Sequence, residues 1–262
     1  MPRRPSVPNA ERFLGRAEVY AAARPSYPPE LRDWLAARHL LGTVADIGAG
    51  TGLFTQLLLA GGARVSAVEP NPDMRAQLAA RLAAAVEAGQ LTVQDGTSEA
   101  TGLPEQSVSL VTAAQAAHWF DPERTLAEFR RILTPDGRVL LVWNDWRGVA
   151  TPFNEAYGQA VSRFYREGEN PLQISRVPEG DLPRFMPGGH ETVIFDNPLP
   201  LSRERLHGLA SSISYLPAPG DPAHALMTAA LDDLFAAHAH EQEEMGQQVT
   251  LHYRTHAFLG RV

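Results

Sequence analysis

The stretch Asp46-Ile47-Gly48-Ala49-Gly50-Thr51-Gly52 decides the fold of this chain. The apolar residues just before it predict a buried strand, and the apolar run 53–60 after it, closed by Gly61-Gly62, predicts a helix. The stretch is therefore a glycine-rich turn between a strand and the N-terminus of a helix. Glycines at such a turn leave room for a ligand, and the first amide N–H groups of the helix point towards it.

Two phosphate-containing ligands can bind at turns of this kind, and the sequence argues against both. A P-loop ends in Gly-Lys-Ser/Thr, but the chain contains no lysine and its 23 basic residues are all arginines. A dinucleotide fingerprint has the spacing Gly-x-Gly-x-x-Gly, and Leu53 stands where that pattern needs its third glycine. The remaining candidate is a ligand with a ribose and an adenine but no phosphate.

An acidic residue follows the turn at a suitable distance. Residues 64–68 predict a second apolar strand, and Glu69 lies at its end, 19 residues after Gly50. A carboxylate about 20 residues beyond a glycine turn, at the tip of the next strand, can accept hydrogen bonds from both ribose hydroxyls. The alternative for Glu69 is a solvated charge in a loop, but its position favours a ribose contact.

These residues resemble motif I of the class I S-adenosylmethionine-dependent methyltransferases, written D/E-x-G-x-G-x-G. The segment from Tyr20 to Pro28 is similar to the Y-x-x-x-R-P-x-Y-P opening of a small-molecule group that includes trans-aconitate methyltransferases. The resemblance covers residues 13–143 and, more loosely, the C-terminal strand. It implies a Rossmann-like, doubly wound α/β fold with a seven-stranded, mostly parallel sheet, an antiparallel last strand and an inserted cap.

The resemblance also implies S-adenosyl-L-methionine as cofactor and S-adenosyl-L-homocysteine as product. It implies that Arg24 meets the methionine carboxylate, since a guanidinium group pairs with a carboxylate bidentately. Thr97 and Ser98 are expected to contact the adenine, although an ordinary polar turn is the alternative there. The expected cofactor-binding residues are Tyr20, Arg24, Asp46, Gly48, Ala49, Gly50, Gly52, Glu69, Pro70, Thr97, Ser98 and Gln115.

Methyl transfer from a sulfonium ion needs proximity, alignment and a water-poor pocket. A general base is required only when the acceptor must lose a proton. His118 is the candidate base, but a lone histidine beside Trp119 and Phe120 is more often structural. The expected substrate-pocket residues are Trp119, Trp143 and Tyr215, and no metal site is expected.

Composition narrows the class of protein. The chain has 262 residues, no cysteine and a formal net charge of −7, which excludes disulfide scaffolds and thiolate sites. Nothing suggests the basic face of a nucleic-acid-binding protein. No apolar run reaches the ~18 residues of a membrane span, and no leader peptide is evident. We therefore expect a cytoplasmic protein that binds neither nucleic acid nor membrane, with its oligomeric state open.

The chain divides into four expected parts. Residues 1–28 are expected to form an N-terminal lid, residues 29–143 the cofactor-binding core, residues 144–220 a cap that includes the sixth strand, and residues 221–262 a C-terminal helix and last strand that complete the core. The expected function is methyl transfer to a small molecule, plausibly a carboxylic acid. The alternatives are an inactive cofactor-binding protein that serves as a sensor or partner subunit, and an NAD-dependent dehydrogenase, with which Leu53 conflicts. The acceptor and the type of atom methylated stay open.

Overall fold

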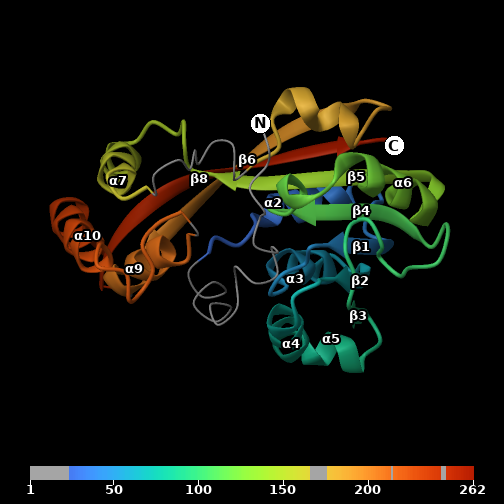
Figure 1. Cartoon of the computed structure of the whole chain (residues 1–262), viewed down its shortest axis with the longest axis horizontal. Helices are drawn as coiled ribbons and strands as arrows, with labels where there is room; N and C mark the ends of the chain where they lie inside the picture. Colours follow the sequence, from blue (N-terminus) through green and yellow to red (C-terminus); the bar gives the residue numbers. More distant parts are fainter. Residues whose placement is uncertain (1–23, 166–175, 214, 243–245) are drawn as a thin grey trace.

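A single mixed sheet organises the computed structural model, which describes residues 24–165, 176–213, 215–242 and 246–262 (Figure 1). The strands follow the order β3-β2-β1-β4-β5-β8-β6, and β7 pairs with β8 outside this path. Strands β1 to β5 are parallel, whereas β8 runs antiparallel to both β5 and β6. The predicted doubly wound sheet with an antiparallel last strand is confirmed. The strands are β1 (Thr43–Ile47), β2 (Arg64–Val68), β3 (Leu91–Gln94), β4 (Val108–Ala114), β5 (Leu133–Asp145), β6 (His190–Leu201), β7 (His240–Gln242) and β8 (Gly246–Gly260).

Helices cover both faces of the parallel part of the sheet. The helices are α2 (Pro29–Ala36), α3 (Leu53–Ala60), α4 (Pro72–Arg81), α5 (Ala83–Glu87), α6 (Pro122–Ile132), α7 (Pro152–Ser162), α9 (Arg203–Ser211) and α10 (His224–His238), with short 3-10 helices η2 (Ala117–Trp119) and η3 (Glu179–Arg184). Along β5, Val139 and Leu141 pack in the cluster that contains α6 and η3, while Leu140 and Val142 pack in the cluster that contains α2 and α3. This alternation is typical of a parallel strand that is buried on both faces.

Two predicted helices differ from the structure. The spacing of Met74, Leu78, Leu82 and Val86 at every fourth residue predicts one helix closed by Gly89, but the structure breaks it at Leu82, whose φ of −113° and ψ of 28° separate α4 from α5. The sequence predicts the C-terminal helix from about residue 223 to residue 244, but the helix ends at His238, because Ala239 is extended and the following residues pair with β8 as β7. The sequence here contains no glycine or proline to end the helix, so tertiary strand pairing overrides a favourable local propensity.

A second hydrophobic cluster lies beyond the end of β5. Strand β8 pairs with β5 only as far as Arg254, but its pairing with β6 continues to Val249. Helices α7, α9 and α10 pack on this extension through residues such as Tyr157, Leu206 and Leu231, and they gather at the left of the molecule in Figure 1. They therefore stand next to the carboxyl ends of the parallel strands.

Residues 177–186 of the expected cap segment do not join this second cluster. Leu182, Phe185 and Met186 are buried in the main core with α6 and β5.

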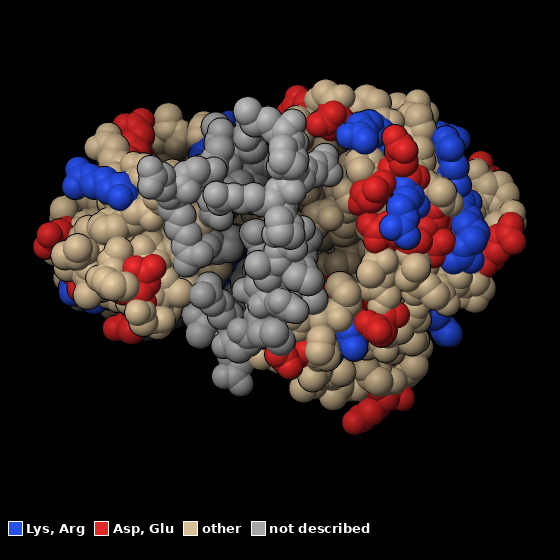
Figure 2. Space-filling view, in the orientation of Figure 1, with Lys and Arg blue, Asp and Glu red and all other residues tan. Residues whose placement is uncertain are grey.

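Basic and acidic side chains are interspersed on the face shown in Figure 2, without a continuous basic surface on its described residues. Among the described residues, no helix is long and apolar enough to cross a bilayer.

Candidate functional site

A cavity of about 460 Å³ opens where β1, β2 and β4 end. The carboxyl edge of an open α/β sheet is the usual place for a ligand. Gly52 and Trp143 do not line this cavity, and Tyr20 lies outside the described residues. The predicted residues that line it are Arg24, Asp46, Gly48, Ala49, Gly50, Glu69, Pro70, Thr97, Ser98, Gln115, His118, Trp119 and Tyr215.

The three glycines of the turn serve different purposes, although all three have positive φ angles. A Cβ atom on Gly48 would lie 2.7 Å from the Cβ atom of Ala116, and one on Gly52 would lie 2.9 Å from Leu78. A Cβ atom on Gly50 would meet only the Met74 sulfur at 4.0 Å and would occupy the cavity. Packing therefore requires the outer two glycines, and the middle one leaves space for a ligand.

Glu69 joins the turn to the end of β2. Its Oε2 atom accepts a hydrogen bond from the Gly50 amide, and its Oε1 atom accepts one from the Asn71 amide, both at 2.9 Å. Burial raises the pKa of this carboxyl, and the two amides lower it. Because a carboxylate oxygen has two lone pairs, each oxygen can accept a further hydrogen bond from a ligand hydroxyl. This geometry suits the predicted ribose contact.

Asp46 lines the cavity but is almost fully buried. Its carboxylate accepts hydrogen bonds from the hydroxyls of Thr55 at 2.6 Å and Thr112 at 2.9 Å, so it links β1 to α3 and β4. Burial raises its pKa to about 6. These contacts hold the start of the glycine turn, so Asp46 acts on a ligand through the backbone that it positions.

The loop after β3 carries Thr97 and Ser98 into the cavity wall. The Thr125 hydroxyl on α6 donates to the Ser98 hydroxyl at 3.0 Å, which ties the loop to the helix. Asp121 begins this helix by accepting hydrogen bonds from two amides of its first turn. The predicted adenine-binding residues are therefore held against an α6 helix that is itself well capped.

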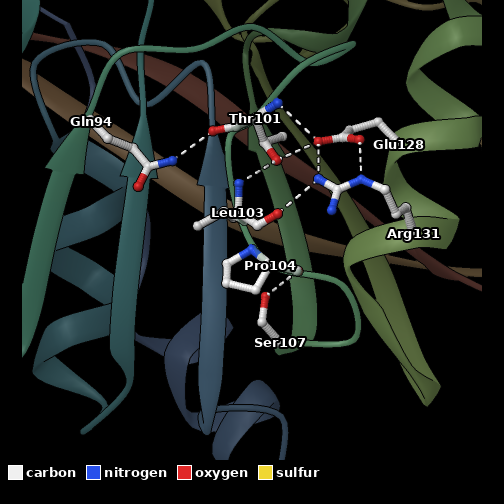
Figure 3. Close-up of polar contacts among 7 residues, drawn as sticks. All are labelled: Gln94, Thr101, Leu103, Pro104, Ser107, Glu128 and Arg131. Carbon is white, nitrogen blue, oxygen red and sulfur yellow. Dashed lines mark hydrogen bonds and ion pairs between the residues drawn. The ribbon is translucent and has the colours of Figure 1, made fainter.

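A polar network fastens the next part of the same loop (Figure 3). The Thr101 amide and hydroxyl donate to Glu128 Oε1 at 2.9 and 2.5 Å, and Arg131 binds both carboxylate oxygens of Glu128 at 2.7 Å. Arg131 also donates to the Leu103 carbonyl, while the Gln94 amide donates to the Thr101 carbonyl. The hydrogen bonds from Arg131 lower the pKa of Glu128 to about 2. Thus the loop is positioned from both β3 and α6.

His118 is arranged as a hydrogen-bond donor. It follows β4 on η2, and the indole N–H of Trp143 donates to its Nδ1 atom at 3.4 Å. Burial, with the positive charge of Arg24, lowers the pKa of His118 to about 4, so the ring is neutral at pH 7. With Nδ1 as acceptor, the proton is assigned to Nε2. A neutral imidazole of low pKa that carries its proton on Nε2 is a weak candidate for the general base.

Several lining residues were not among those expected from the sequence. Asn144 follows Trp143 at the end of β5, and its Oδ1 atom accepts a hydrogen bond from the Thr255 hydroxyl at 2.6 Å. Tyr253 reaches the cavity from β8, near Tyr215 of the cap. The other additional lining residues are Pro25, Tyr27, Thr51, Leu53, Phe54, Asn71, Met74, Gly96, Glu99, Ala114, Ala116 and Phe120. Some of these lie one or two residues from predicted positions, which is the only signal that could have found them.

A comparison with known families matches the part of the chain that contains the glycine turn, Glu69 and the loop after β3. Residues 45–141 match the family model described as a methyltransferase domain. This stretch is similar to methyltransferase domains. S-adenosylmethionine is the cofactor of methyltransferases of this class, and the open space at Gly50 beside the carboxylate of Glu69 fits its ribose. The expected cofactor thus agrees with the observed residues, while membership of the trans-aconitate group remains a prediction.

Curated relatives of the chain are also named as methyltransferases. The chain is 46% identical over 135 residues to an uncharacterised methyltransferase of Mycobacterium tuberculosis, a match that spans 51% of that relative, about half of its length. It is 29% identical over 243 residues to an uncharacterised methyltransferase-like protein of Schizosaccharomyces pombe, and this alignment covers 91% of each chain. A solved structure from Anaeromyxobacter dehalogenans, named as a type II methyltransferase, shares the fold with a TM-score of 0.66 and 22% identity, over 91% of this chain and 97% of that one.

No group of metal-binding side chains was found in the described part of the chain. Within those residues, no three His, Asp or Glu side chains lie together in a way that could hold a metal ion. The carboxylates at the cavity are instead occupied with backbone amides or hydroxyls, as at Glu69 and Asp46.

Proposed function

We propose that the protein transfers the methyl group of S-adenosylmethionine to a small-molecule acceptor, and that this acceptor is a carboxylic acid. One observation carries the proposal. A single cavity is lined both by the glycine turn with Glu69 and by Tyr215 and Tyr253 on the cap side. Groups that hold a cofactor and groups that can hold an acceptor therefore share one space, which is what direct group transfer needs.

The residues of the chain would bind and orient the reactants. The Gly48–Gly50 backbone and the Glu69 carboxylate would hold the ribose end of the cofactor, and Thr97 and Ser98 would contact its base. When bound, this cofactor supplies a methyl group that its sulfonium charge already activates. Trp119 and Phe120 line the same cavity and would exclude water from it.

The acceptor is proposed to be small because of the size and charge of the site. A cavity of about 460 Å³ lies within the range of about 300–1,000 Å³ typical of small-molecule sites. A chain with a formal net charge of −7 is a poor partner for a phosphate backbone. A carboxylate acceptor is already deprotonated at pH 7, so it needs no base. That requirement agrees with a neutral, donating His118.

The remaining parts of the chain have proposed roles around this cavity. Arg24 and Tyr27, at the described end of the segment 1–28, line the cavity, which supports a role for that segment in covering the cofactor. We assign the cap, residues 144–220, to the acceptor side, because Asn144 and Tyr215 lie there. Residues 221–262 add the last strand, which supplies Tyr253.

Turnover tests this proposal. The protein is incubated with methyl-labelled S-adenosylmethionine and a chelator, over carboxylic acids, phenols, amines and transfer RNA. Methyl esters of acids release methanol in base, whereas methyl ethers and methylamines do not. We expect label that base releases from an acid, unaffected by the chelator. Transfer only to RNA, or loss of activity with the chelator, would contradict the proposal. Cofactor binding without any transfer would favour the inactive sensor or partner subunit.

A further inference from the structure

A small chamber adjoins the main cavity and is lined by three arginines. We propose that it binds a carboxylate of the methyl acceptor other than the group that is methylated. This carboxylate lies at the opposite end of the acceptor or, in a polyacid, next to the methylated group. This inference rests on the proposed methyl transfer. The chamber has a volume of about 50 Å³, and its lining includes Arg24, Arg147, Arg176, Tyr215 and Tyr253. It is large enough for one small planar group and too small for a whole acceptor.

The chamber belongs to the acceptor side of the site. Gly50 and Glu69 line the main cavity but not the chamber, whereas Trp143 and Asp145 at the end of β5 line the chamber but not the main cavity. The residues that line both spaces are Arg24, Gln115, Asn144, Tyr215 and Tyr253. A molecule in the main cavity can therefore extend one end into the chamber without displacing groups from the glycine turn.

The charges that line the chamber favour an anion. Among the described residues, three guanidinium groups and the carboxylate of Asp145 line it, which gives a net charge of +2 before a cofactor binds. If Arg24 pairs with the methionine carboxylate, as the resemblance implies, Arg147 and Arg176 remain for the acceptor. Glu179 pairs with Arg176 at 2.6 Å from outside the lining and reduces the net charge to +1, but the Glu179 side chain is 70% exposed and well solvated. The Arg147 and Arg176 side chains are only 20% exposed, so their attraction for an anion is less screened than at an open surface.

The tyrosines supply neutral donors beside these charges. Burial raises the pKa of Tyr215 and Tyr253, although Arg24 and Arg147 oppose that shift in both. These two arginines and both phenols line the chamber together. The phenols keep their protons at pH 7 and can donate hydrogen bonds to an anion. Charged and neutral donors that converge on a small space are typical of a carboxylate site.

Binding measurements test the chamber without requiring turnover. Calorimetric titration in the presence of S-adenosylhomocysteine measures the affinity of the protein for two acids and their amides. The affinity for succinate is compared with that for succinamide, and the affinity for phenylacetate with that for phenylacetamide. The first variant combines Arg147→Met with Asp145→Asn, so that no carboxylate is left without its partner, and the second is Arg176→Gln. The matched control is Arg163→Gln, which removes the same charge from an exposed position at the end of α7.

We expect at least one acid to bind tenfold or more tightly than its amide. Both chamber variants should lose about tenfold in affinity for that acid, as expected when one charge-assisted contact is removed, with little change for S-adenosylhomocysteine or in the control. Equal binding of acid and amide, no binding of either acid at millimolar concentration, or unchanged acid binding in both variants would overturn the inference. The proposed function fails separately, in the turnover assay, if the acid binds in the chamber but no methyl group is transferred to an acid.

Discussion

Replacing Glu69 by glutamine probes the cofactor site with little change of shape. Each carboxylate oxygen accepts one backbone amide at 2.9 Å and retains a lone pair for the ligand. A glutamine side chain keeps one acceptor oxygen, but its NH2 group must face the other backbone N–H. The variant therefore loses one internal hydrogen bond and one acceptor for a ribose hydroxyl, and the remaining ligand contact is no longer charge-assisted.

The expected loss follows from these contacts. A hydrogen bond to a charged group contributes about 1.5–3 kcal/mol, against about 0.5–1.5 kcal/mol for a neutral pair. Loss of one charged contact and weakening of the second together cost about 2–4 kcal/mol of binding free energy, a decrease in affinity of roughly 30- to 700-fold.

Calorimetric titration with S-adenosylhomocysteine measures this difference, and Glu87→Gln on the exposed end of α5 is the matched control. Urea unfolding of each variant checks that the fold is intact. If folded Glu69→Gln binds the ligand within threefold of the unchanged protein, the carboxylate does not hold the ribose and the reasoning fails.

Three further predictions concern packing and pH. Gly50→Ala and Gly52→Ala both place alanine at a positive φ and should both lose stability. Gly52→Ala should lose a further ~1–3 kcal/mol in urea unfolding, because its methyl group also overlaps a packed leucine, whereas Gly50→Ala should weaken cofactor binding more; the reverse order would contradict the assigned roles. Glu128→Gln should lower the free energy of unfolding by about 1.5–3 kcal/mol at pH 7, with no such loss for Glu123→Gln on the same helix. Since the pKa of Glu128 is lowered from 4.5 to about 2, its contribution is present above pH 4.5 and is lost as the pH falls towards 2. The pKa of His118 falls from 6.5 to about 4 on folding, so the contribution of this residue to stability drops as the pH falls from 6.5 to 4. Asp46, whose pKa is raised to about 6, acts with the opposite sign in this range, so the test is the difference between variants: His118→Asn should gain stability relative to the unchanged protein as the pH falls from 6.5 to 4, and a pH-independent difference would count against the buried neutral ring.

The sequence predicted the cofactor side of the site because its signals are local. The glycine turn and the following helix are contiguous in sequence. The position of Glu69 follows once the next strand is assumed to lie beside the first, and the parallel pairing of Ile47 with Val68 confirms that arrangement. Such residues can be predicted from sequence because they lie close together along the chain and because consecutive parallel strands are usually neighbours in the sheet.

The acceptor side depends on long-range pairing and could not be predicted in the same way. Tyr253 reaches the cavity only because β8 inserts between β5 and β6. Trp143 was expected in the substrate pocket; it packs against Phe258 at 5.8 Å between ring centroids and lines the small chamber but not the main cavity, whereas its neighbour Asn144 lines both. Position at the end of a strand predicts the neighbourhood of a site, but not which of the two adjoining spaces each side chain lines.

The most direct test of the central claim is a calorimetric titration of the unchanged protein with S-adenosylmethionine and, in parallel, with NAD. The glycine turn, the space at Gly50 and the carboxylate of Glu69 predict one equivalent of S-adenosylmethionine bound per chain and no saturable binding of NAD. Saturable binding of NAD without binding of S-adenosylmethionine would contradict the account.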